Sequence, residues 1–392
     1  MREIIYSEHW QIAKANKIYK KGIPGMNSTN NEDLNPQEQS VFFYGDDAPS
    51  YNVEFINHLN HISESKKISE DNYSIGGEVE KLEITMAQKL GKEASVFFPT
   101  GTLANHVAIR QLCLSNKRAI VPEQSHIYQD SGDAVQQLSG INLIPLGPNK
   151  PYFGLDELKG ALNTSISGRV TTPVGAVVIE TPVRRCYGRV MPYEVMKDVT
   201  GYCHQQGIPT HLDGARLLIA SAVTKISLEA YSNLFDTVYI SMWKYFGAPY
   251  GAVLAGSKEF CENLYHVRRM FGGSLPSASL AAALALKGLE TFQTDAELAN
   301  KKSAELLESL DGLPNINVKR YQDGSNIIPV EIDQNVDLAK LYERLQSQNV
   351  FINSDTKSEN ILHLTMNLSI LRKPNNELLR IFAKAIEDAK SI

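Results

Sequence analysis

Short apolar runs alternate with segments of helical periodicity through the middle of the chain. The strands that this pattern predicts are 94–98, 118–121, 142–146, 175–179, 210–212, 237–241 and 251–255. Helices are predicted at 78–90, 103–114, 193–206 and 227–234. Alternation of this kind is typical of βα units, so we expect an α/β fold with a mostly parallel central sheet and helices on both faces.

The pattern changes at about residue 290. A helix at 294–310, strands at 317–321, 326–332 and 361–366, and helices at 338–348 and 375–390 are predicted there. This mixture indicates a smaller C-terminal α+β domain. A polar, turn-rich stretch at 24–40 separates an N-terminal arm from the body. We therefore expect an arm at 1–40, a large domain at 41–295 and a small domain at 296–392.

Composition excludes several classes of protein. The chain has 43% hydrophobic and 21% charged residues and a formal charge of −5, so it lacks the basic excess of a nucleic-acid or anionic-membrane binder. No stretch reaches the ~18 apolar residues of a membrane span, and the N-terminus lacks the apolar run of a secretory signal. The four cysteines are scattered without a CxxC pair. Reduced thiols in a cytoplasmic protein are therefore expected.

Two segments at strand ends carry candidate chemistry. Lys244 follows the strand 237–241 and stands beside aromatic and glycine-rich sequence, where a partly desolvated amine can form an imine with an aldehyde. Asp213 ends the strand 210–212, at the sheet edge where ligands of α/β folds bind, and can keep a pyridine nitrogen protonated. The plain alternatives are a solvent-facing lysine and a helix N-cap aspartate.

Two further segments add a cradle for an anion and a flat side chain. Gly101 and Thr102 lie where a strand passes into a helix, and backbone N–H groups there can hold a phosphate. His126 follows the strand 118–121 and can stack on a heterocycle. An ordinary capped helix and a loop histidine are the alternatives.

Together these segments indicate a site for pyridoxal 5′-phosphate (PLP). They provide an aldehyde trap, a ring-nitrogen acid, a phosphate cradle and a stacking group at the strand ends of one sheet. Neither a Walker loop nor the GxGxxG fingerprint of a nucleotide-dependent oxidoreductase is present. No residue is assigned to a metal.

The same segments resemble a known family. FFPTGTLANHVAI, EQSHIYQDSG, HLDGARL and SMWKYFGAPYGAVLAGS are similar, in order and spacing, to the threonine aldolase and β-eliminating lyase family of fold-type I PLP enzymes. The resemblance implies a PLP-dependent transferase-like fold, a homodimer or homotetramer and a role in amino acid metabolism. It also implies that Lys244 forms the Schiff base, Asp213 contacts the ring nitrogen, Gly101 and Thr102 hold the phosphate, and His126 stacks on the ring and transfers protons.

The match is weaker on the substrate side. By resemblance, Arg216 lies near the cofactor oxygen or the substrate carboxylate. The family's S-D-x-x-T segment corresponds to 45–49, which lacks the serine, and an arginine expected in the small domain is replaced by His363. Arg184, in an E-x-P-x-R sequence, is a candidate replacement as a fork-shaped carboxylate binder, and a surface arginine is its alternative.

The working hypothesis is cleavage of a β-hydroxy-α-amino acid, such as threonine, allo-threonine or a phenylserine-like compound, to glycine and an aldehyde. The base that takes the β-hydroxyl proton is His126 or a water. One alternative is β-elimination to an α-keto acid and ammonia. The other, of a different class, is a PLP-fold binding protein without catalytic activity.

Overall fold

The computed structural model describes residues 39–47, 52–353 and 360–390. The predicted N-terminal arm at 1–40 therefore lies almost entirely outside the described residues.

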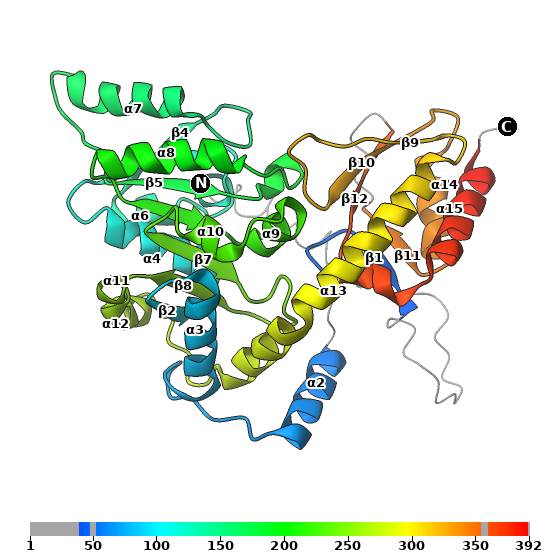
Figure 1. Cartoon of the computed structure of the whole chain (residues 1–392), viewed down its shortest axis with the longest axis horizontal. Helices are drawn as coiled ribbons and strands as arrows, with labels where there is room; N and C mark the ends of the chain where they lie inside the picture. Colours follow the sequence, from blue (N-terminus) through cyan, green and yellow to red (C-terminus); the bar gives the residue numbers. More distant parts are fainter. Residues whose placement is uncertain (1–38, 48–51, 354–359, 391–392) are drawn as a thin grey trace, which may run out of the picture. The chain divides into compact units, whose positions relative to one another are not determined.

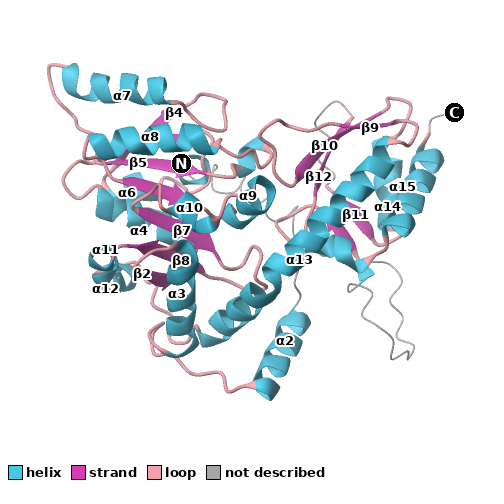
Figure 2. Ribbon diagram, viewed as in Figure 1, coloured by secondary structure: helices cyan, strands magenta, loops and turns pink. Residues whose placement is uncertain are grey.

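A seven-stranded sheet forms the centre of the larger part of the molecule (Figure 2). Its strands are β2 (Ala94–Phe98), β3 (Arg118–Pro122), β4 (Asn142–Leu146), β5 (Ala176–Glu180), β6 (Thr210–Asp213), β7 (Thr237–Ser241) and β8 (Ala252–Gly256). They are ordered β2-β8-β7-β6-β5-β3-β4, and β8 alone runs antiparallel to its neighbours. The predicted α/β fold with a mostly parallel sheet is confirmed.

Helices connect and cover these strands. They are α2 (Asn52–Ser65), α3 (Gly77–Leu90), α4 (Gly101–Leu112), α5 (His126–Gln129), α6 (Ala134–Ser139), α7 (Leu155–Ser167), α8 (Tyr193–Gln205), α9 (Leu217–Thr224), α10 (Leu228–Ser232), α11 (Lys258–Glu262) and α12 (Leu264–Met270). Strands β5, β7 and β8 are buried along their whole length because helices lie on both faces of the sheet. The continuous apolar runs of the sequence come from this two-sided burial.

The C-terminal part has a sheet and an apolar core of its own. Strands β9 (Ile316–Val318), β10 (Ile327–Ile332) and β12 (Ile361–Thr365) form an antiparallel sheet in the order β12-β10-β9. Helices α14 (Leu338–Gln346) and α15 (Asn375–Ala389) pack against each other beside it. Leu306, Val330 and Phe382 belong to this core, which forms a cluster distinct from that of the seven-stranded sheet.

Two features of this part follow no local pattern. Strand β1 (Val41–Phe43) pairs in parallel with β11 (Val350–Ile352), so the first described residues join the C-terminal elements. Helix α13 (Ser279–Asp311) is continuous through 33 residues and contacts both α3 and α15 (Figure 1). The expected boundary at 295/296 falls inside this helix, and the domain limits stay a prediction. Among the described helices, none has the length and apolarity needed to cross a membrane.

Candidate active site

Lys244 lies three residues beyond the end of β7 and is half-buried. Burial, and next the neighbouring Arg216 guanidinium, lower the pKa of its amine from 10.5 to about 8. The carboxylates of Asp46, Asp213 and Glu180 act in the opposite direction. Such influence requires proximity, so Lys244 and Asp213 belong to one group of interacting charges. A lysine with this pKa is a usable nucleophile near neutral pH.

Asp213 ends β6 and is 2% exposed. Its Oδ2 atom accepts a hydrogen bond of 2.5 Å from the Asn105 side-chain amide, and its Oδ1 atom accepts one of 3.1 Å from the Ala215 backbone N–H. Both carboxylate oxygens are thus held by donors, which fixes the orientation of the carboxylate.

The N-terminus of α4 lies on the same face of the sheet as Asp213, because Asn105 belongs to this helix. Thr100 is the N-cap, and its hydroxyl accepts a hydrogen bond of 3.2 Å from the Leu103 backbone N–H. A Cβ at Gly101 would collide with the Tyr239 hydroxyl of β7, so only glycine lets the helix begin this close to the sheet. The first amides of α4, those of Gly101 and Thr102, have no helical partner and form a basis for an anion site.

His126 begins the short helix α5 beyond β3. Its backbone N–H donates a 2.6 Å hydrogen bond to Glu180, the last residue of β5. Burial lowers the pKa of the His126 imidazole, and the charges of Asp213 and Lys244 also act on it. His126 therefore lies near both, in the neutral form that can accept a proton.

Glu180 is a site residue that sequence reasoning did not identify. It is 4% exposed, and burial raises the pKa of its carboxyl to about 7, with Asp213 adding to the shift. Its oxygens accept from the backbone N–H groups of His126 at 2.6 Å and Arg184 at 3.4 Å. Glu180 thereby ties together the two loops that carry predicted site residues. Its place at the start of the E-x-P-x-R sequence, at the end of an apolar strand, was the available signal.

Arg216 forms a two-pronged ion pair with Asp46, with N–O distances of 2.5 and 2.9 Å. The Tyr245 hydroxyl hydrogen-bonds the same carboxylate. Because both Arg216 and Asp46 act electrostatically on Lys244, this pair belongs to the same charged group. Asp46 comes from the serine-lacking segment 45–49, of which Ala48 and Pro49 lie outside the described residues.

The remaining two predicted residues, Arg184 and His363, contact other side chains than those of the charged group. Arg184 is about half exposed and pairs with Asp130 at 2.6 Å, while its charge also reaches His126. His363 stacks on Tyr187 with ring centroids 3.8 Å apart, and its Nε2 atom lies 3.4 Å from the Tyr321 hydroxyl. Tyr187 follows Arg184 in the same loop, so this loop links His363 to the neighbourhood of Arg184.

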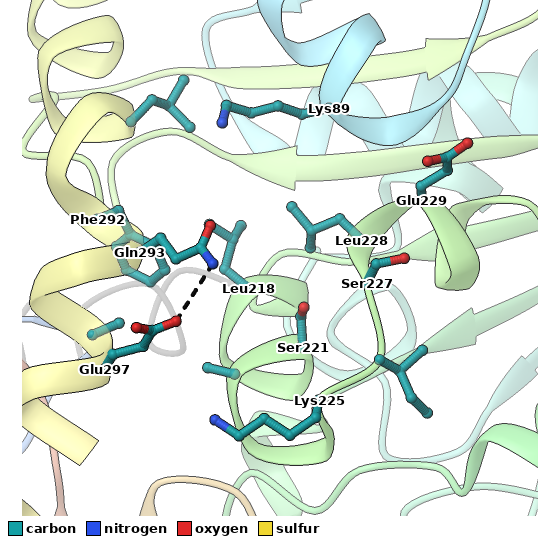
Figure 3. Close-up of a pocket in the computed structure, with 14 residues that line it drawn as sticks. Lys89, Leu218, Ser221, Lys225, Ser227, Leu228, Glu229, Phe292, Gln293 and Glu297 are labelled. Carbon is teal, nitrogen blue, oxygen red and sulfur yellow. Dashed lines mark hydrogen bonds between the residues drawn. The ribbon is translucent and has the colours of Figure 1, made fainter. Parts of the chain in front are cut away.

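A cavity of about 470 Å³ lies between α3, α9, α10 and α13 (Figure 3). Leu218, Leu228 and Phe292 belong to its apolar wall, and none of the predicted site residues lines it. Its two lysines are balanced by two glutamates, so its charge favours no class of ligand.

The residues of the charged group fit PLP. Lys244 offers an amine of lowered pKa, and Asp213 offers a buried, oriented carboxylate. The free amides at the start of α4 suit a phosphate, and neutral His126 suits a ring face. These are the features that an aldehyde-bearing, phosphorylated pyridine requires.

Comparison with known proteins shows which family the chain belongs to. The model of the β-eliminating lyase family matches residues 66–333. The chain belongs to this family. A low specificity L-threonine aldolase of Saccharomyces cerevisiae is 30% identical over 208 residues, which make up 53% of each chain. A low-specificity L-threonine aldolase of Candida albicans is 27% identical over 229 residues, or 58% of this chain and 60% of the relative. The chain thus spans little more than half the length of these curated relatives.

Solved structures extend the likeness to the whole fold. A protein of Listeria monocytogenes, provisionally named an L-allo-threonine aldolase, has a TM-score of 0.75 and 26% identity, covering 89% of this chain and 98% of that one. A serine palmitoyltransferase of S. paucimobilis, solved with bound PLP and myriocin, has a TM-score of 0.67 at 15% identity, covering 98% of each chain. The expected fold of fold-type I PLP enzymes is therefore confirmed.

Proposed function

We propose that this chain is a PLP-dependent lyase that cleaves a β-hydroxy-α-amino acid, such as threonine, allo-threonine or a phenylserine-like compound, to glycine and an aldehyde. The observation that carries the proposal is the electrostatic coupling of Lys244, an amine of lowered pKa, to the buried carboxylate of Asp213. The names of its relatives, low-specificity and allo-threonine aldolases, support the choice of reaction.

PLP, when bound, supplies an aldehyde that captures amines and a ring that accepts the electrons of a bond broken at Cα. Lys244 is the residue that would hold it, and Gly101 and Thr102 would bind its phosphate. Asp213 would keep a proton on the ring nitrogen, since its two oxygens are already oriented by Asn105 and Ala215. With a pKa of about 8, roughly one Lys244 in ten is a free amine at pH 7.

Proton transfer at the substrate is assigned to His126. Its lowered pKa keeps the imidazole neutral at physiological pH, ready to take the β-hydroxyl proton directly or through a water. Glu180 holds the His126 backbone in place by the 2.6 Å hydrogen bond.

Arg216 and Arg184 are the candidates to bind the substrate carboxylate. The Arg216 guanidinium holds Asp46 through two of its nitrogens, and Arg184 holds Asp130 through one, so the substrate carboxylate would replace or share these aspartates. His363, in its aromatic group with Tyr187, would border the substrate rather than bind its charge.

The broader assignments belong to the same proposal. A small amino-acid substrate, neither nucleic acid nor membrane as partner, a homodimer or homotetramer, and a cytoplasmic location are consistent with the family. The described cysteines are all free thiols, which supports a reducing compartment.

A substrate panel with product identification tests the reaction. Purified holoenzyme is incubated with L- and D-threonine, the allo isomers, phenylserine, serine and tryptophan, and aldehyde, glycine, α-keto acid and ammonia are measured. Equal amounts of glycine and aldehyde are expected from at least one β-hydroxy substrate. Keto acid and ammonia without aldehyde would establish β-elimination instead. Binding of PLP with no product from any substrate would indicate the binding protein.

A further inference from the structure

Four buried side chains form one continuous line of hydrogen bonds that ends on Asp213. Thr237 Oγ1 lies 2.8 Å from His211 Nδ1, and His211 Nε2 lies 2.9 Å from Asn105 Oδ1. The Asn105 amide nitrogen then donates to Asp213 at 2.5 Å. None of the four residues is more than 2% exposed, so water does not compete for these bonds.

The donor and acceptor of each hydrogen bond in this line can be assigned by starting from the Asp213 carboxylate. Asp213 accepts as a carboxylate, so Asn105 turns its NH₂ group towards it and its oxygen towards His211. The His211 Nε2 atom must then carry the hydrogen. Burial lowers the pKa of His211 to about 4, so the ring is neutral, and its Nδ1 atom accepts the hydrogen bond from the Thr237 hydroxyl.

The sequence builds this line through spacing and register. His211 and Asp213 are two residues apart on β6, and their side chains therefore share one face of the sheet. Thr237 of β7 is the parallel-strand partner of His211. Helix α4 packs on this face and brings Asn105 between the two residues of β6.

We propose that His211 is a positioning residue that acts on the cofactor through Asn105 and Asp213. A side-chain amide can rotate to present either its nitrogen or its oxygen. The Nε2–H group of His211 holds the amide with its nitrogen facing the carboxylate. Without it, Asn105 is free to turn its oxygen towards Asp213, which repels the negative charge and leaves the buried carboxylate short of a donor.

The consequence concerns the bound cofactor. This inference rests on the proposed PLP site, in which Asp213 keeps the ring nitrogen protonated. A carboxylate that has lost its donor is poorly oriented and more basic, so it would draw the proton away from the ring nitrogen towards itself. The line Thr237–His211–Asn105 thus sets the electronic state of the ring from a distance, without touching it.

Three variants separate positioning from folding. His211→Leu removes the Nε2–H donor. His211→Gln restores a donor at a comparable reach, since its amide nitrogen takes the place of Nε2. His106→Gln is the control, because His106 follows Asn105 on the same helix, is 2% exposed and bonds Ser139 instead.

The first readout is the binding and absorbance of PLP. His211→Leu should raise the PLP dissociation constant about tenfold and move the bound absorbance to shorter wavelength, as expected when the ring nitrogen loses its proton. His211→Gln and His106→Gln should retain the wild-type spectrum. An unchanged spectrum and affinity in His211→Leu would overturn the proposal, as would an equal change in His106→Gln.

The second readout needs no cofactor. Nitrogen-15 NMR of the histidine rings in apoenzyme, assigned by the signal lost in His211→Gln, should show His211 as the neutral Nε2–H form between pH 6 and 8. If His211→Leu does not fold, Thr237→Val replaces it. Loss of the hydroxyl that donates to Nδ1 leaves the His211 ring less firmly held, and the same changes in PLP affinity and absorbance, smaller in size, should follow. An Nδ1–H ring in the wild type would overturn the proposal. If the wild-type protein shows the Nε2–H form of His211 but does not bind PLP, the proposed function is contradicted instead.

Discussion

Lys244 is the residue on which the proposed chemistry depends. Its environment lowers the pKa of its amine chiefly by burial and by Arg216, while nearby carboxylates limit the shift. At neutral pH a fraction of the Lys244 side chains is therefore a neutral amine and the rest is protonated. An amine that can take either form suits a group that must gain and lose a proton repeatedly.

Borohydride reduction of the holoenzyme should attach the cofactor to Lys244. Mass spectrometry of the digested protein is expected to find the adduct on the peptide that contains Lys244. The Lys244→Ala variant should lack the visible absorbance, and its turnover should be lower by several orders of magnitude. Lys92→Ala is the control, because Lys92 is also desolvated but bonds the Phe235 carbonyl away from the site. An adduct on another lysine would refute the assignment.

Glu83 on α3 makes stability depend on pH. Burial raises the pKa of its carboxyl from 4.5 to about 7, although the Phe97 backbone N–H partly opposes this. The folded state then binds more protons than the unfolded state between these values, so the free energy of unfolding falls as pH rises through that window.

In Glu83→Gln, the fall in the free energy of unfolding between low and neutral pH should be smaller than in the wild type by about 1–3 kcal/mol. The measurement is urea unfolding at pH 5 and pH 7.5. Glu262→Gln, at an exposed position of α11, is the control and should leave the pH dependence as in the wild type. A Glu83→Gln variant with the wild-type pH dependence would show that another group is responsible, Glu180 being the next candidate.

Among the helices and strands, α4 carries several of the residues that form or support the candidate site. Its N-cap Thr100, the close packing of Gly101 on Tyr239 and the bond from Asn105 to Asp213 all lie within its first two turns. The sequence predicted a helix beginning near here, at residue 103. Its anchoring to β6 depends on contacts that the helical pattern does not reveal.

Thr100→Ala should destabilise the protein by about 1 kcal/mol and also weaken PLP binding, because the cap orders the amides that would bind phosphate. Thr100→Ser keeps the hydroxyl and should behave as the wild type. Ser257→Ala removes an equivalent cap, with a 3.1 Å bond to Phe260, from α11. That variant should lose similar stability with no change in PLP affinity. Equal effects of the two alanine variants on affinity would contradict a special role for α4.

At the scale of the whole molecule, the C-terminal part reaches the loops of the seven-stranded sheet through polar contacts. Arg189, in the loop after β5, pairs with Asp323 at 2.7 Å, and its guanidinium lies over the Tyr321 ring. The Asp323 side chain is only 11% exposed, so this ion pair is better shielded than most surface pairs.

A double-mutant cycle with Arg189→Ala and Asp323→Ala should give a coupling free energy of about 1 kcal/mol in thermal or urea unfolding. The matched pair Lys319 and Glu331, with an N–O distance of 3.3 Å, is roughly half exposed on both sides and should give a coupling free energy near zero. A coupling of Arg189 with Asp323 no larger than that of the control pair would show that this contact does not hold the two parts together.

The sequence by itself predicted most of the strands and helices of the central sheet and singled out Lys244 and Asp213 as the candidate site residues. These features follow from short-range patterns: apolar runs of one strand length, helical periodicity and glycine or threonine at a strand-to-helix turn. The predicted and observed limits of 94–98, 142–146 and 237–241 agree for this reason. Helix α13 was predicted too short, since its first eight residues, SLAAALAL, are almost wholly apolar and show no helical periodicity.

Only the tertiary structure decided which distant residues meet. Asp46 and Arg216 are 170 positions apart, and Asn105 and Asp213 are 108 apart. The pairing of β1 with β11, the burial of Glu180 and the line of bonds through His211 depend likewise on strand register and helix placement. Local periodicity carries no information about such encounters, because the free energy of each contact depends on how the whole core brings its two partners together.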